Sequence, residues 1–221
     1  FVLLSPLAAS TEGQIDAELH ELRIPKLFGI FFNASVRPFL GRKPVRQALA
    51  MAIDREALIA ETAGNAGVPI NSAIPPGALG FDAGVASLPY DLASAKALLV
   101  GDGWKATGTE AVFERTEGTG RNRTIQRLEI RLTTSDAPEL AKAAGLIAEM
   151  WRALGAKTDI RVLDVNELET SVIRPRAYEA LLFGEVFGHD PDPFAFWHTS
   201  QLKDPGLNIA LYSNPKVDQL L

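Results

Sequence analysis

Apolar residues recur along the chain at spacings that predict alternating strands and helices. The run KLFGIFFN, residues 26 to 33, is rich in aromatic and β-branched side chains and is typical of a buried strand. A helix starting at Pro44 is indicated by one apolar face, made of Val45, Ala48, Leu49, Ala52 and Ile53. Asp54 is placed to end this helix by capping the next one, REALIAETA.

The clearest helix in the pattern runs from residue 137 to residue 154. Asp136 and Glu139 form a capping pair at its start, and Gly155 is suited to end it. One side carries a continuous apolar stripe, formed by Ala137, Leu140, Ala141, Ala144, Ile147, Ala148, Trp151 and Leu154. We therefore expect this helix to be buried along one whole side.

Strands with period-two alternation surround this helix in the sequence. EAVFERT and IQRLEIRLTT are interpreted as the two arms of a hairpin, with Leu128, Ile130 and Leu132 pointing inward. KTDIRVL and YEALLFG are two further strands, separated by the polar helical segment 164–175. Strands that alternate with helices predict the α/β class, with a mixed sheet and helices packed on it.

Residues 64–90 interrupt this alternation and are rich in glycine and proline, which predicts a long irregular loop. Asp91 then caps the helix LASAKALLV, and GDGW ends it, with Trp104 as a core aromatic side chain. Arg46 and Arg55 lie off the apolar face of their helices. We interpret both as structural residues that pair with acidic neighbours.

Composition narrows the classes of function. The 221 residues contain no cysteine, which excludes thiol nucleophiles, cysteine–zinc sites and iron–sulfur clusters. The net charge is -5 and basic residues are scattered, so nucleic acid is not an expected partner. The apolar runs are also much shorter than the ~20 residues that a membrane-spanning helix needs.

Most of the candidate chemistry lies in GHDPDPFAFWH, residues 188 to 198. This segment follows the strand 178–184 directly, so it lies at a strand's carboxyl end, where open α/β sheets bind ligands. Nitrogen and oxygen ligands for a metal are offered by His189, Asp190, Asp192 and His198. The usual i, i+4 histidine pair is missing, however, and Pro191 and Pro193 restrict convergence of the four side chains.

A metal-dependent hydrolase using this His/Asp cluster is the alternative function. Against it, the sequence has no G-x-S-x-G nucleophile elbow, and the two aspartates lie too close along the chain to flank a glycosidic bond. Aspartate before proline is also typical of turns and helix caps. Phosphate-binding glycine motifs are absent as well. We therefore expect no catalysis, no cofactor and no bound metal.

Four blocks of sequence, in this order, carry a family resemblance. They are FFNAS…PF…KPVRQALAMAIDREALI, PYDLASAKALLVGDGW, YEALLFGEVFGHDPDPF and YSNPKVDQLL. Together they cover residues 25–221, and VRQALAMAIDRE is the most specific part. In these blocks the chain resembles family 5 of the bacterial extracellular solute-binding proteins, the peptide/nickel-type binding proteins of ABC importers.

This resemblance implies a lobe of the type II periplasmic-binding-protein fold. Residues 1–25 would be a lead-in from a preceding lobe or hinge, and residues 26–221 the second lobe, with the export signal and a closing C-terminal segment outside this chain. The resemblance further implies a monomer that captures a peptide or similar small solute by lobe closure, in the periplasm or anchored outside the membrane. ABC transporter permease subunits would be its partners. Peptides, nickel chelates, sugars and opines all stay open as ligands.

Three residues are predicted to contact the solute: Glu185, Asp190 and Trp197. A carboxylate at this place can bind a cationic group, and an aromatic ring can stack on it. In peptide-binding members of the resembled family, an aspartate before the Asp-Pro element anchors the ligand's ammonium group, after a tryptophan that closes the strand. Here Gly184 stands near that tryptophan position and Glu185 is the only acid before Asp190, so the sequence departs from the family pattern at the anchor.

Overall fold

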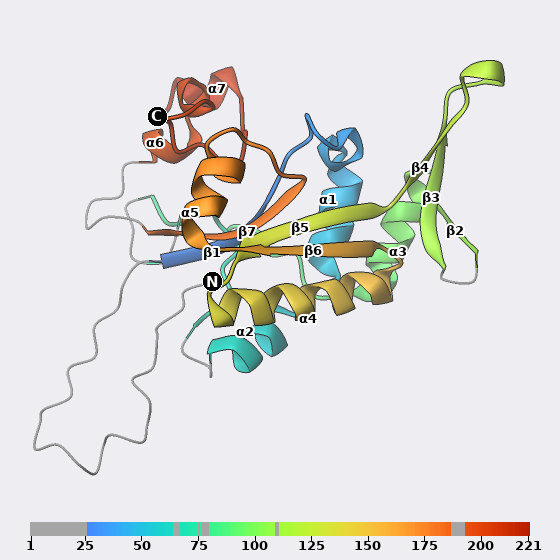
Figure 1. Ribbon diagram of the computed structural model, residues 1–221, viewed down its shortest axis with the longest axis horizontal. Helices are drawn as coiled ribbons and strands as arrows, with labels where there is room; N and C mark the ends of the chain where they lie inside the picture. Colours follow the sequence, from blue (N-terminus) through green and yellow to red (C-terminus); the bar gives the residue numbers. More distant parts are fainter. Residues whose placement is uncertain (1–25, 64–66, 75, 77–79, 109–110, 187–192) are drawn as a thin grey trace, which may run out of the picture.

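A four-stranded sheet forms the centre of the molecule. The computed structural model describes residues 26–63, 67–74, 76, 80–108, 111–186 and 193–221. The strand order is β1–β7–β5–β6, made of β1 (Lys26–Phe32), β5 (Glu129–Ser135), β6 (Lys157–Leu163) and β7 (Ala180–Val186). β5 runs parallel to β6 and β7, whereas β1 pairs antiparallel with β7 (Figure 1). The mixed sheet predicted from the alternation of strands and helices is therefore confirmed.

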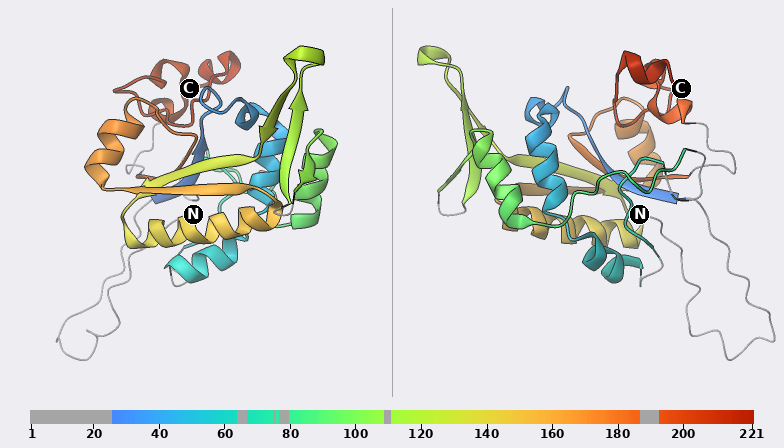
Figure 2. Two further views of the ribbon diagram at one scale, coloured as in Figure 1. Left: turned by 45° about the vertical axis from the view of Figure 1, so that its right-hand side comes forward. Right: turned by 180° about the vertical axis from the view of Figure 1, so that it is seen from behind.

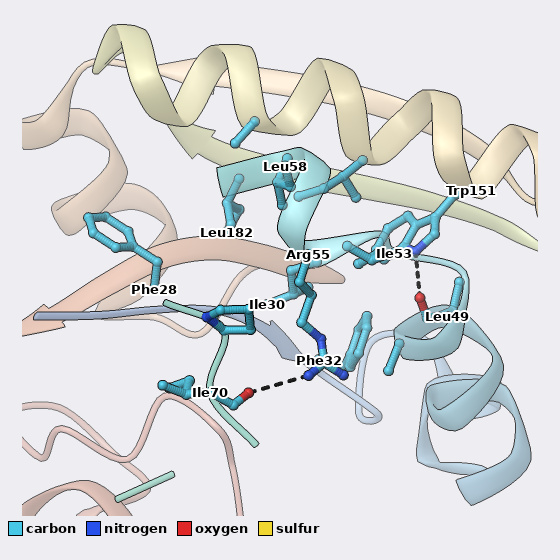
Figure 3. Close-up of a pocket in the computed structure, with 15 residues that line it drawn as sticks. Phe28, Ile30, Phe32, Leu49, Ile53, Arg55, Leu58, Ile70, Trp151 and Leu182 are labelled. Atoms are coloured by element: carbon cyan, nitrogen blue, oxygen red, sulfur yellow. Dashed lines mark hydrogen bonds between the residues drawn. The ribbon is translucent and has the colours of Figure 1, made fainter. Parts of the chain in front are cut away.

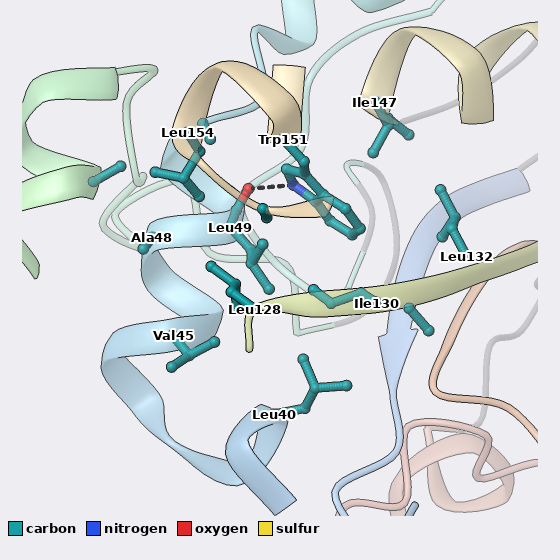
Figure 4. Packing of buried hydrophobic residues seen from close by; sticks show 14 of the residues in the cluster. Leu40, Val45, Ala48, Leu49, Leu128, Ile130, Leu132, Ile147, Trp151 and Leu154 are labelled. Carbon is teal, nitrogen blue, oxygen red and sulfur yellow. Dashed lines mark hydrogen bonds between the residues drawn. The ribbon is translucent and has the colours of Figure 1, made fainter. Parts of the chain in front are cut away.

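Four helices pack into the main core on one face of this sheet. They are α1 (Lys43–Met51), α2 (Arg55–Ala63), α3 (Leu92–Gly101) and α4 (Pro138–Leu154). Ile130 and Leu132 of β5 point into the same core (Figure 4). Trp151 of α4 is 0% exposed and donates a hydrogen bond from Nε1 to the Leu49 carbonyl of α1, over 3.0 Å. The apolar faces predicted for α1 and α4 are thus the faces that build the core.

Short helical segments cover the other face of the sheet. These are α5 (Val165–Glu167), η4 (Leu168–Ile173), α6 (Phe194–Trp197), η5 (Thr199–Gln201) and α7 (Pro215–Asp218). Figure 1 shows them on the side of the sheet away from α2 and α4. A second, smaller core lies beneath them, formed by Phe31, Leu168, Val172, Tyr178, Leu181 and Ile209. The second face is therefore covered over β1 and β7, whereas most residues of β6, at the edge of the sheet, are exposed.

The predicted hairpin is wrong in its second arm. β3 (Val112–Glu117) pairs with β4 (Thr124–Arg127) and with β2 (Lys105–Thr107) in a separate three-stranded sheet that projects from the molecule (Figure 2). The chain then changes sheets at Leu128, whose N–H donates to the Phe113 carbonyl and whose carbonyl accepts from the Lys157 N–H. The next seven residues become β5 of the main sheet, because their alternating apolar side chains are needed in the core.

The helix caps were predicted with one error. Asp54 and Asp91 accept hydrogen bonds from backbone N–H groups of the helices that follow them, as expected. Asp136 does not cap α4, which begins at Pro138 with Ala137 as its N-cap residue. The backbone N–H of Asp136 instead donates to the Leu163 carbonyl at the end of β6, which holds this residue beside the end of the sheet.

Asp102, in the GDGW motif, connects three elements. Its carboxylate accepts two hydrogen bonds from the Arg42 guanidinium, each of 2.6 Å, and one from Trp104 Nε1 over 3.2 Å. Its carbonyl accepts from Arg115 Nε of β3 over 3.0 Å. The bidentate pair with Arg42 is the main reason that the pKa of Asp102 is lowered. This cluster ties the start of α1 to the end of α3 and to the projecting sheet.

Candidate functional site

A pocket of about 420 Å³ opens on the face of the sheet that carries α6 and α7. The end of β1 forms its floor with Phe31 and Phe32. Arg46 of α1 lines one part of it, and a second wall is formed by Trp197, the last residue of α6, and Tyr212. We call this the aromatic pocket. Its mixture of apolar surface, aromatic rings and one cation is typical of small-molecule sites.

A buried asparagine holds the second wall together. Asn208 is 0% exposed, and its Nδ2 donates to the carbonyls of Trp197 (3.2 Å), His198 (3.3 Å) and Tyr212 (2.9 Å). Its Oδ1 accepts from the Tyr212 N–H over 3.1 Å. The rings of Trp197 and Tyr212 consequently meet edge to face, with centroids 6.3 Å apart at an interplanar angle of 75°. The two aromatic side chains form one wall of the pocket, and the Asn208 side chain holds the backbone segments that carry them.

Arginine and tyrosine side chains anchor this wall to the rest of the fold. Arg176 donates from Nε to the Leu202 carbonyl over 3.2 Å and from Nη2 to the Gly206 carbonyl over 2.6 Å. The buried hydroxyl of Tyr178 donates to the Ile209 carbonyl. Residues far apart in the sequence thereby place Trp197 over the end of β1.

Glu185 lies near the end of β7 with its side chain buried, 7% exposed. Of its neighbours on the same face of the strand, Leu181 belongs to the second core and Phe183 packs against it. Burial raises the pKa of the Glu185 carboxyl to about 7, and no described residue donates a hydrogen bond to it or forms an ion pair with it. Glu185 does not line the aromatic pocket, so its predicted contact with the solute stays a prediction.

The structure therefore separates the predicted site residues. Trp197 lines the aromatic pocket, Glu185 is buried at the end of β7, and Asp190 lies outside the described residues, as do His189 and Asp192. The ring of His198 stacks on Phe194 with centroids 4.3 Å apart, and its Nδ1 accepts from the Ser200 N–H over 3.1 Å. In the described part of the chain, no three His, Asp or Glu side chains lie close enough together to hold a metal.

Arg46 is the charged residue in the described lining of the aromatic pocket, and we did not predict it as a site residue. We expected it to pair with an acidic neighbour, but among the described residues it has none, and its Nη1 donates to the Leu40 carbonyl over 2.9 Å. The sequence does hold one signal for this role. No acidic residue stands three or four positions away from Arg46 along its helix, where a pairing partner would have to be.

A second pocket, of about 220 Å³, lies between β1, α1, α2 and α4 and shares Ile30 and Phe32 with the aromatic pocket. Apolar core side chains such as Phe28, Ile30 and Trp151 form most of its lining (Figure 3). Among the described residues that line it, Arg55 is the one with a charged side chain, and it donates to the carbonyls of Ile70 and Leu88 and to Asn71 Oδ1. Arg55 thus tethers the irregular loop to α2, and the predicted acidic partner is absent among the described residues.

Comparison with known proteins identifies the family. Residues 8–207 match the family described as bacterial extracellular solute-binding proteins, family 5, middle region. The chain belongs to this family. Among curated relatives, the oligopeptide-binding protein AppA of Bacillus subtilis is 25% identical over 185 residues, which are 81% of this chain and 32% of AppA. Heme-binding protein A of Haemophilus influenzae is 30% identical over 197 residues, 87% of this chain and 32% of that protein.

Solved structures share the fold of this family 5 protein. Bacillus subtilis AppA in complex with a nonapeptide superimposes with a TM-score of 0.78 at 23% identity, covering 89% of this chain and 38% of AppA. NikZ from Campylobacter jejuni in complex with Ni(L-His) superimposes with a TM-score of 0.70 at 23% identity, covering 89% of this chain and 38% of NikZ. The chain thus spans about a third of the length of the curated relatives it matches, and the predicted type II fold is confirmed.

Proposed function

We propose that this chain is the second lobe of the substrate-binding component of an ABC importer, and that it captures a peptide or similar small solute outside the cytoplasm by closure of two lobes. Family membership over residues 8–207 supports this role, and the relatives named above are binding proteins. The observation that carries the proposal is the aromatic pocket, a concave site that combines aromatic rings, apolar surface and one arginine along its described lining.

In this proposal, residues 1–25 lead in from the other lobe, and residues 26–221 supply one side of the binding cleft. Each lobe would contact one side of the solute, and closure would expel water from between them. Trp197 stacks on the solute, whereas Glu185 and Asp190 bind its cationic group. No helix in the described part of the chain has the length and apolar composition to cross a membrane. Delivery to ABC permease subunits and a monomeric state belong to the same proposal.

The test is to identify what the full-length, two-lobed protein retains when it is purified from its own cells. Native mass spectrometry should find a stoichiometric small solute, and Trp197→Ala should remove most of it. Tyr90→Ala is the matched control, because Tyr90 is an exposed aromatic residue that does not line the pocket. A full-length protein without any bound solute, and without affinity for a peptide library, would refute the proposal.

The relatives indicate which solutes to test first. AppA is named for oligopeptides and the Haemophilus influenzae protein for heme, while the NikZ structure holds Ni(L-His). Peptides come first, because the pocket offers aromatic surface and a cation but no described group of metal ligands. A stoichiometric metal held by His189 and His198 would instead favour the hydrolase alternative.

A further inference from the structure

Arg46 is a charged residue without a counter-charge. Several arginines elsewhere in the fold have acidic partners: Arg42 pairs with Asp102 at 2.6 Å, and Arg174 pairs with Glu169 at 2.6 Å. Within the described residues Arg46 forms no ion pair, and its Nη1 donates to the Leu40 carbonyl. The remaining guanidinium donors are therefore available to a ligand.

The surroundings of Arg46 favour an anion. The described lining of the aromatic pocket contains no aspartate or glutamate, and Arg46 is its one charged side chain. A half-buried guanidinium in such a pocket is shielded in part from water, which strengthens its attraction for a negative group. Its planar fork of N–H donors matches a carboxylate in two parallel hydrogen bonds.

The aromatic wall of the same pocket selects a second feature of the ligand. Trp197 and Tyr212 present their rings to the pocket, and Asn208 fixes the backbone of both residues through hydrogen bonds. Rings held in this way favour a planar or aromatic group over a flexible polar one, because little side-chain entropy is lost on binding. The pocket volume of about 420 Å³ leaves room for a group of the size of one aromatic amino acid.

We propose that Arg46 determines specificity by binding the carboxylate of a solute whose adjacent aromatic or planar group lies against Trp197 and Tyr212. A short peptide that ends in an aromatic residue has this chemistry. The inference rests on the proposed function, because it names the class of solute that the same pocket takes.

A pair of probes isolates the charge. N-acetyl-L-tryptophan and its amide share the aromatic ring and differ in the carboxylate, and their binding to this chain can be followed by NMR titration. We expect the acid to bind about tenfold more tightly than the amide, the order of magnitude of one charge-assisted hydrogen bond. High salt should reduce the difference, because the pocket is open on one side.

Variants then assign the preference to Arg46. Arg46→Gln should bind acid and amide equally. Arg46→Lys should keep part of the preference for the acid, because its ammonium group still attracts a carboxylate as a point charge. Arg152→Gln is the matched control, because Arg152 is an exposed arginine of α4 outside the pocket. Circular dichroism of each variant checks that the loss of the bond to Leu40 has not unfolded the chain.

The outcomes separate this inference from the proposed function. If acid and amide bind this chain equally, or if Arg46→Gln keeps the preference for the acid, the role of Arg46 is wrong while solute capture by the pocket stands. If neither probe shifts the NMR resonances of Trp197 and Tyr212, the pocket does not bind this class of solute and the proposal for Arg46 is wrong. Solute retention by the full-length protein then decides the proposed function independently.

Discussion

Replacement of Glu185 by glutamine should make the fold more stable at high pH. The side chain is 7% exposed, and burial raises its pKa to about 7 from an ordinary value of 4.5. Because the folded state holds the proton more tightly than the unfolded state, stability is greatest at low pH. It falls as the pH rises from the unfolded pKa to the folded one, where the carboxylate becomes charged inside the protein.

The size of this effect follows from the two pKa values. Between pH 5 and pH 8, Glu185 should cost the folded state about 2.5 kcal/mol, since each pKa unit corresponds to about 1.4 kcal/mol. Glutamine has nearly the same shape but no charge at any pH. The stability advantage of Glu185→Gln over the wild type should therefore be small at pH 5 and should grow by roughly this amount between pH 5 and pH 8.

Urea denaturation of both proteins at pH 5 and pH 8 measures the difference directly. Other titrating groups cancel when the two proteins are compared at the same pH, which isolates the contribution of Glu185. A stability difference that stays constant between the two pH values would show that this carboxylate is not buried uncharged. A difference of opposite sign would show that a positive partner holds it ionised in the folded state.

Three further substitutions test the packing. Trp151→Phe should lower the free energy of unfolding by about 2 kcal/mol in thermal or urea denaturation, because the buried carbonyl of Leu49 loses its hydrogen-bond donor. An unchanged stability would show that a water molecule replaces the indole N–H. Asp102→Asn should cost about 1 kcal/mol at neutral pH, with the difference vanishing in acid as Asp102 is protonated and the pair with Arg42 is lost. Gly155→Ala should cost more than about 1 kcal/mol, since φ is 103° and the new Cβ would lie 2.8 Å from a phenylalanine ring; a neutral result would mean that this turn can change its conformation.

The helices were predicted well from the sequence, because the residues that determine a helix lie close together along the chain. The apolar stripe of α4 and the aspartate caps at residues 54 and 91 depend on residues a few positions apart, and the structure confirms them. The change of sheet at Leu128 was missed for the opposite reason. It depends on hydrogen bonds to Phe113 and Lys157, which local alternation cannot reveal.

The candidate site was predictable only in part. Trp197 was chosen from its place after a strand, and it does line a pocket. Arg46 comes from a helix near the other end of the chain and was interpreted as structural. That it lines the same pocket as Trp197 becomes visible only in the fold. The burial of Glu185 follows from its position beside the second core, which no periodicity in β7 indicates.

Titration calorimetry on this chain and on the full-length protein tests the central claim that residues 26–221 supply one side of a two-lobe solute site. The same peptide library, with N-acetyl-L-tryptophan as a reference, should bind the full-length protein at least about tenfold more tightly, because closure buries the solute on both sides. Trp197→Ala should weaken binding to both proteins. Equal affinity and equal ligand preference for the two proteins would contradict the account, because this lobe would then hold a complete site by itself.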